Sequence, residues 1–257
     1  SNRLRKVLKR KTGWDFKWKI YGDWDSAVRA VQRKQADFAV LPAYYFAKTM
    51  SESRPSLEPF VTFVSNESIA SPFCLYTKKG NEFFTIDHLL NTRLAIGDED
   101  DWVLLNKVFN DNGLPFPPAD FFDRIEPMTP ESAFSALVFN KVDVIFSDAL
   151  SMAYVMEGNP NASRIAIIEC TSTLTNLLVV NRLGIDREVL RKLEAVLVDM
   201  HRDPDFSEFH RFMKTTGGRW VPSKSTYYSD WESIIENVKK NGWDREFEKI
   251  KKAAGGK

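Results

Sequence analysis

The sequence has few of the residues that most often carry catalysis or metal binding. It contains two cysteines, Cys74 and Cys170, without CxxC spacing, and three histidines, His88, His201 and His210. Structural zinc sites use Cys and His at short spacing, so no such site is expected. The chain also lacks the glycine-rich nucleotide motifs, the GxSxG nucleophile motif and the HExxH zinc motif. The sequence therefore makes no positive case for catalysis, and we predict that the protein is not an enzyme.

The sequence also has no large excess of positive or negative residues and no long apolar run. Lys and Arg total 36 and Asp and Glu total 35, so no overall field attracts nucleic acid. The basic runs 3–11 and 249–252 are interpreted as solvated helix faces. No apolar run is long enough to cross a bilayer. The chain begins with Ser-Asn, as expected of a processed or expressed fragment.

What the sequence does contain is enough apolar material for a large core, and a pattern that occurs twice. Of 257 residues, 43% are hydrophobic, which allows one large domain or two smaller ones. Residues 26–46 predict a helix, a turn with Asp37, a buried strand and a new helix, and residues 132–154 predict the same order with Asp143 in the turn. Two readings remain open: a chance similarity of two α/β units, or two similar domains that face each other.

Predicted strands and helices alternate along much of the chain. From Asp186 onward the sequence is predicted to be helical, because apolar stripes recur at helical spacing. The alternation predicts an α/β fold with mainly parallel sheets. The predicted strands cover residues 16–21, 38–41, 60–64, 71–77, 93–97, 124–128, 144–146, 164–169 and 174–180.

Two extended segments, 71–77 and 174–180, bracket the middle of the chain and are candidates for paired crossover strands. We therefore expect one lobe formed by residues 1–76 and 174–257, with the C-terminal helices packed on it. The second lobe is expected to consist of residues 77–173.

Several stretches carry a resemblance to a known family. They are KRKTGWDF, AVRAVQRKQADFAVLPAYY, SPFCLYTKKG, TIDHLLNTRLAIGDEDDW and ESAFSALVFNKVDVIFSDAL, and they cover most of residues 3–180. In order and spacing the chain resembles a type 2 periplasmic solute-binding protein, nearest to the phosphonate/phosphate-binding branch of the ABC transporter receptors.

The resemblance implies a two-lobed α/β fold with two crossover strands as a hinge and a small solute held in the interlobe cleft. It implies a protein of the periplasm or another extracytoplasmic site, with or without a membrane anchor, that hands its solute to a membrane permease. We expect a monomer that needs no cofactor, metal or nucleic acid. The family begins with a strand before its first helix, whereas this chain begins at the helix, so that first strand is expected to be missing.

Two departures from the family bear on the solute. Family members that bind phosphonate have a Ser/Thr-rich turn after the strand that matches 94–97, whereas this chain has Asp98-Glu99-Asp100-Asp101. A like-charge contact at ~4 Å costs about 4 kcal/mol at an effective dielectric near 20. The family's Ser-His-acid segment is replaced by Thr129-Pro130-Glu131. A phosphonate is therefore not the expected solute.

Ligands of open α/β sheets bind at the carboxyl ends of strands, which selects a candidate site. Aromatic faces together with carboxylates favour a cation, so we expect an amine-bearing or quaternary ammonium solute. The acids of 98–101 could instead only cap a helix, at roughly 0.3–1 kcal/mol each, or hold a divalent metal. One tyrosine of the pair is expected to pack inside, and Trp24 could be a core anchor. The candidates are Trp24, Tyr44, Tyr45, Ser71, Asp100, Asp101, Trp102, Thr129, Glu131, Ser147 and Asp148.

Cys74 and Cys170 have two readings, buried free thiols or a disulfide, because both lie near the proposed hinge segments and the periplasm is oxidising. Two alternatives to the transport receptor also stay open. One is the periplasmic sensor domain of a signalling receptor. The other is an enzyme on the same bilobal fold, for which Asp148 and Glu131 are the only candidate acid–base pair.

Overall fold

The computed structural model describes residues 2–51, 56–66, 68–171, 174–175 and 177–255, which divide into two compact units. Unit 1 comprises residues 1–70 and 175–232, and unit 2 comprises residues 71–174 and 233–257. The chain passes from unit 1 to unit 2 in β3 (Ala70–Ser71) and returns to unit 1 in β9 (Leu174–Thr175). These two strands pair as a two-stranded sheet. The expectation of two crossover strands is therefore confirmed.

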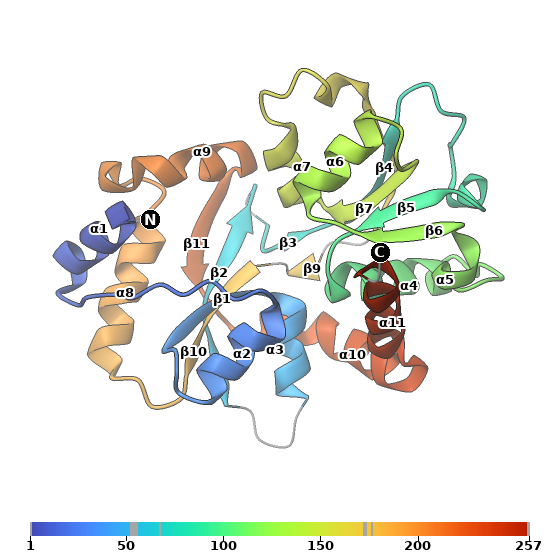
Figure 1. The fold of residues 1–257 in the computed structure, drawn as a ribbon. Helices are drawn as coiled ribbons and strands as arrows, with labels where there is room; N and C mark the ends of the chain where they lie inside the picture. The colour runs from blue at the N-terminus through green and yellow to red at the C-terminus, as the bar shows by residue number, and fades with distance from the viewer. Residues whose placement is uncertain (1, 52–55, 67, 172–173, 176, 256–257) are drawn as a thin grey trace. The chain divides into compact units, whose positions relative to one another are not determined.

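Unit 1 is built on a four-stranded sheet with the order β1-β10-β2-β11 (Figure 1). Its strands pair antiparallel throughout, which corrects the prediction of mainly parallel sheets. A strand that is apolar on both faces indicates burial between two layers, but it does not encode the direction of its neighbours. The strands are β1 (Phe38–Pro42), β2 (Leu57–Ser65), β10 (Leu177–Arg182) and β11 (Gly218–Pro222).

Helices of unit 1 form where the sequence offers apolar stripes and caps. Asp23 precedes α2 and its side chain accepts a hydrogen bond from the Ser26 N–H at 2.7 Å, as expected of an N-cap. The unit contains α1 (Asn2–Thr12), α2 (Trp24–Gln32), α3 (Ala43–Met50), α8 (Arg187–Asp199), η3 (Pro204–Phe206), α9 (Ser207–Thr216), η4 (Ser225–Tyr228) and the start of α10 (Ser229–Asn241).

Unit 2 is built on a five-stranded mixed sheet with the order β6-β5-β7-β4-β8. In it β5 pairs parallel with β6 and β7, whereas β4 pairs antiparallel with β7 and β8. The strands are β4 (Phe73–Lys78), β5 (Arg93–Ile96), β6 (Arg124–Pro127), β7 (Val144–Asp148) and β8 (Ile165–Cys170). The helices are η1 (Ile86–Leu89), α4 (Glu99–Asp111), α5 (Pro118–Phe121), α6 (Pro130–Val138), α7 (Ala149–Met156), η2 (Ala162–Arg164), the end of α10, and α11 (Trp243–Gly255).

Two predicted elements are wrong. Residues 16–21 are a loop, because their alternation has no buried face: Ile20 is 97% exposed and Trp18 is 53% exposed. The region after Asp186 is not wholly helical, because α9 ends at Gly217 and β11 follows. Gly217 has a φ of 58°, in the left-handed region where glycine closes helices without steric cost.

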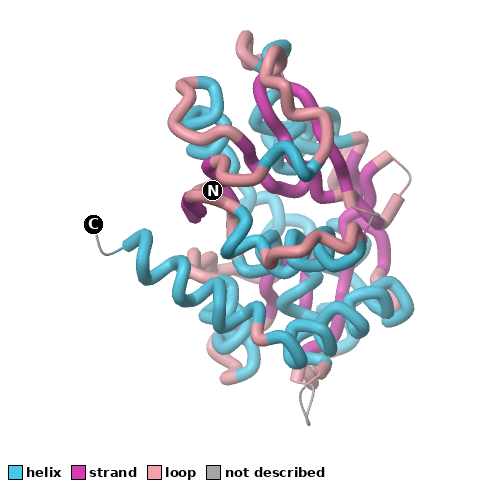
Figure 2. The backbone as a smooth tube through the Cα atoms, turned by 90° about the vertical axis from the view of Figure 1, so that its right-hand side faces the viewer, coloured by secondary structure: helices cyan, strands magenta, loops and turns pink. Residues whose placement is uncertain are grey.

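The C-terminal helix lies with unit 2, whereas the sequence assigned it to the first lobe. Figure 2 shows α11 as the helix nearest to the C mark, and it ends at Gly255. It packs on α4 and β6, and the Phe247 ring stacks on Trp102 with 6.2 Å between ring centroids. Its apolar stripe predicted burial, but not which layer would cover it.

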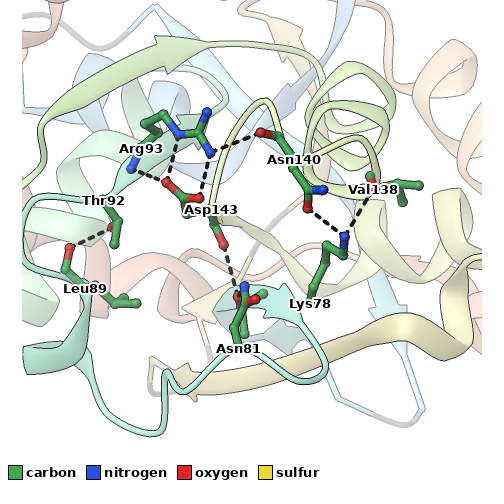
Figure 3. A network of polar contacts seen from close by, with 9 residues as sticks. Lys78, Asn81, Leu89, Thr92, Arg93, Val138, Asn140 and Asp143 are labelled. Carbon is green, nitrogen blue, oxygen red and sulfur yellow. Dashed lines mark hydrogen bonds and ion pairs between the residues drawn. The ribbon is translucent and has the colours of Figure 1, made fainter.

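The two turns with Asp37 and Asp143 have matching roles. In unit 2 the Asp143 carboxylate accepts hydrogen bonds from the Arg93 backbone N–H and Nε, each at 2.9 Å, and from Arg93 Nη2 at 2.8 Å (Figure 3). In unit 1 the Asp37 carboxylate accepts a hydrogen bond from Arg182 Nε at 2.7 Å. In both units an aspartate before a strand therefore holds an arginine of a neighbouring strand.

The two cysteines form a disulfide inside unit 2. They are direct cross-strand neighbours, Cys74 on β4 and Cys170 on β8, which explains how residues 96 positions apart come to meet. Of the two readings of the sequence, the disulfide is the one that the structure confirms.

Candidate functional site

Four aspartates gather around the carboxyl ends of β5 and β7. These strands are parallel neighbours, with Ile96 opposite Phe146, so the residues that follow them lie at the same edge of the sheet. Asp98, Asp100 and Asp101 follow β5, and Asp148 ends β7. We call these four residues the acidic edge.

The first turn of α4 supplies most of the acidic edge. Asp98 is its N-cap residue with an extended backbone, and Glu99, Asp100 and Asp101 form the first turn, where the helix dipole favours negative charge. Asp100 is only 7% exposed and Asp101 only 8%. These acids are therefore buried, unlike the solvated acids that usually begin a helix.

Gly97 allows the Asp101 carboxylate to approach the backbone. The Gly97 N–H donates a hydrogen bond to Asp101 Oδ2 at 3.0 Å. A Cβ atom at position 97 would lie 2.2 Å from that oxygen, so a larger residue would displace the carboxylate. Sequence reasoning placed Gly97 at the strand end without recognising this role. A glycine directly before an acidic helix start was the available signal.

Burial and mutual repulsion keep the acidic edge partly protonated. Burial, and after it the charges of Asp98 and Asp148, together raise the pKa of Asp100 to about 8. The pKa of Asp101 is raised well above its usual range by burial, then by Asp100 and Asp148. Because the two groups interact, they titrate as a pair, and a proton is retained near neutral pH.

Asp148, the member of the acidic edge on β7, and Tyr76 on the neighbouring strand β4 interact electrostatically. Asp148 Oδ1 accepts a hydrogen bond from the Ser151 N–H at 2.8 Å and so caps α7. Tyr76 lies buried on β4, and its pKa is raised first by burial and then by the charges of Asp148 and Asp101. The sequence analysis missed Tyr76, although a phenol inside an apolar strand is a signal that a polar partner lies nearby.

Other candidates of unit 2 lie in three kinds of surroundings. Ser71 and Ser147 are buried in β3 and β7. Trp102 is fully buried and stacks on Phe247, in the packing of α4 against α11. Thr129 and Glu131 are exposed at the start of α6, where Thr129 Oγ1 accepts a hydrogen bond from the Ser132 N–H at 3.4 Å.

The aromatic candidates form a cluster in unit 1. The Tyr45 ring lies 6.2 Å from Trp24 and 5.0 Å from Tyr44, measured between centroids. Tyr44 is 0% exposed and Tyr45 4%, so both pack inside, while Trp24 is partly exposed. Lys48 Nζ lies 5.8 Å and 6.0 Å from the two tyrosine centroids. The cation that these rings contact is thus one of the protein's own.

Neither a metal centre nor a membrane span is found in the part of the chain that the structure describes. No group of three or more His, Cys, Asp or Glu side chains among those residues has an arrangement suited to a metal ion. None of the described helices combines the length and the apolarity that crossing a bilayer requires.

Comparison with known families identifies the protein's class. The family model of the periplasmic phosphonate substrate-binding proteins of ABC transporters matches residues 2–228. The chain belongs to this family. Its members are solute-binding receptors and not enzymes, and membership implies a small-molecule ligand, a permease partner and an extracytoplasmic location. A comparison with curated protein sequences finds no significant match.

Solved structures agree on the fold. PhnD1 from Prochlorococcus marinus, in complex with methylphosphonate, is 13% identical with a TM-score of 0.78, over 93% of this chain and 92% of that chain. A binding protein component of an ABC phosphonate transporter from Pseudomonas aeruginosa is 16% identical with a TM-score of 0.76, over 99% and 91%. The aliphatic sulphonate binding protein SsuA from Escherichia coli is 12% identical with a TM-score of 0.62, over 93% and 82%. The protein has the type 2 periplasmic binding protein fold.

Proposed function

We propose that this receptor binds a cationic solute, a small amine or quaternary ammonium compound, rather than a phosphonate. The observation that carries the proposal is the acidic edge. Asp100 and Asp101 are buried, and the charges that act most strongly on them are other carboxylates. Neither forms an ion pair with a basic side chain within the described residues.

A cation and a phosphonate would meet opposite electrostatics here. A phosphonate would add negative charge beside four aspartates, and each like-charge contact at ~4 Å would cost about 4 kcal/mol at an effective dielectric near 20. An ammonium group would offset the repulsion that now holds a proton in the cluster, and its N–H groups would donate to the carboxylates. The same features therefore favour a positive group and disfavour a phosphonate.

The family fold supports binding by closure of two lobes around the solute, with β3 and β9 as the hinge. Closure needs contacts that are stronger in the closed state, because only differential affinity shifts the equilibrium. We propose units 1 and 2 as those lobes and the acidic edge as the part of unit 2 that contacts the solute. No observation on the described residues favours the sensor or the enzyme alternative.

The test is a binding screen by thermal shift and calorimetry with primary amines, quaternary ammonium compounds, amino acids, methylphosphonate and Ca²⁺. We expect an ammonium compound to stabilise the protein selectively. Asp148→Asn keeps an acceptor for the α7 cap while removing the charge, so it should weaken that binding about tenfold or more.

A matched control exists at another helix start. Asp186 caps α8 by accepting hydrogen bonds from the N–H groups of Glu188 at 2.8 Å and Val189 at 3.3 Å. Asp186→Asn removes the same charge from the same kind of cap and should leave solute affinity unchanged. Selective stabilisation by methylphosphonate, with no response to any amine, would overturn the proposal.

A further inference from the structure

A cavity of about 320 Å³ lies within unit 1, between the end of α8, the helix α9 and the start of β11. Its lining includes four side chains that are basic or can become so, His201, His210, Lys214 and Arg219, together with Met213. No acidic side chain is among the described residues that line it. We call it the basic cavity.

Backbone carbonyl groups orient both histidine rings. His201 Nδ1 lies 2.9 Å from the Val198 carbonyl oxygen, and His210 Nε2 lies 3.2 Å from the Met200 carbonyl oxygen. A carbonyl oxygen only accepts, so the nitrogen that faces it carries the hydrogen in each ring. This leaves the second nitrogen of each ring, His201 Nε2 and His210 Nδ1, for another partner.

Helix electrostatics explain only part of this grouping. Lys214 lies in the last turn of α9, where the helix dipole favours a cation. That argument does not extend to Arg219 on β11, nor to two histidine rings that line the same space from different segments. The shared property of the set is positive or potentially positive charge around one concave surface.

We propose that the basic cavity binds a small oxyanion, of the phosphate or sulfate type. Lysine and arginine give such ions short, charge-assisted hydrogen bonds, and an imidazole ring that carries hydrogen on both nitrogens adds one more donor. The cavity has a volume at the lower end of the range of small-ligand sites. This site uses residues of unit 1 alone, so it is independent of the acidic edge and of the solute proposed above.

The test follows imidazole ¹H–¹⁵N resonances during titration with inorganic phosphate and, separately, sulfate. The resonances of His201 and His210 should shift and saturate at millimolar or lower concentrations. His88 is an internal control, because it lies in unit 2 and its Nδ1 accepts a hydrogen bond from the Phe84 N–H at 3.2 Å. Its resonance should not move.

Lys214→Ala should weaken phosphate binding about tenfold, while Lys6→Ala, which removes an exposed lysine of α1, should not change it. Arg219→Lys provides a second variant that keeps the charge but loses the paired N–H donors, and it should weaken binding less. If neither histidine responds, or if the response survives Lys214→Ala at full strength, the basic cavity is not an oxyanion site. A shift confined to His88 would overturn the proposal equally.

Discussion

At the scale of single residues, one hydrogen bond of the acidic edge requires a residue without a side chain at position 97. Gly97 has no side chain, and this absence lets its N–H reach Asp101 Oδ2. That hydrogen bond favours the ionised form of Asp101, against burial and the neighbouring carboxylates that raise its pKa. A balance of this kind makes the site sensitive to a single methyl group.

Gly97→Ala should therefore lower the free energy of unfolding by about 1–3 kcal/mol, because the added Cβ overlaps with the Asp101 carboxylate. Chemical denaturation monitored by circular dichroism measures the change. Gly22→Ala is the matched control, since no atom lies within 4 Å of a Cβ built there. Equal stability of the two variants would mean that the Asp101 carboxylate relaxes at no cost.

At the scale of elements, two opposing effects act on the charged form of the acids in the first turn of α4. The helix dipole favours its acids, whereas burial and mutual repulsion disfavour their charge. The raised pKa values indicate that burial and repulsion dominate for Asp100 and Asp101. The stability of the element should consequently depend on pH.

Because the folded-state pKa of Asp100 is raised, its protonated form favours the folded state. This contribution is complete below the unfolded-state pKa of about 4 and is lost as the pH rises through about 8. The wild-type protein should lose stability across this window, and Asp100→Asn should lose less and be the more stable of the two at pH 8. Denaturation at a series of pH values checks this. Parallel pH profiles of the two proteins would contradict it.

Sequence patterns predicted most helices and strands because capping and apolar spacing are local properties. Asp23, Thr129 and Asp148 each cap the helix that the sequence indicated. Strand direction was not predictable in the same way, since β1 pairs with β10 from more than a hundred residues later. The acids of residues 98–101 were found, but the electrostatic interaction of Asp101 with Tyr76 on β4 joins distant parts of the chain, and no local pattern encodes it.

At the scale of the whole molecule, the fold is that of the family, whereas the turn after β5 is rich in acidic residues. The family model matches residues 2–228. Within this range, the turn after β5 carries acids in place of the hydroxyl groups expected for phosphonate binding. Fold and solute are separable in this way because a few loop residues at strand ends determine recognition, while the sheets determine the architecture.

If the solute is bound by closure of the two units, its addition should reduce the radius of gyration. Small-angle X-ray scattering with and without the ammonium compound that stabilises the protein most measures the change. Asp148→Asn should show a smaller reduction at the same solute concentration. A radius of gyration that stays constant while calorimetry shows saturation would exclude closure as the mechanism.

The disulfide between Cys74 and Cys170 has a mechanical consequence. When the molecule is stretched from its two ends, tension passes through the sulfur–sulfur bond and bypasses the chain between the two cysteines, which are 96 positions apart. The oxidised chain should then extend roughly 330 Å less than the reduced chain, at about 3.5 Å per residue. Most of the strands of unit 2, and the acidic edge with them, are thus shielded from any pull applied along the backbone.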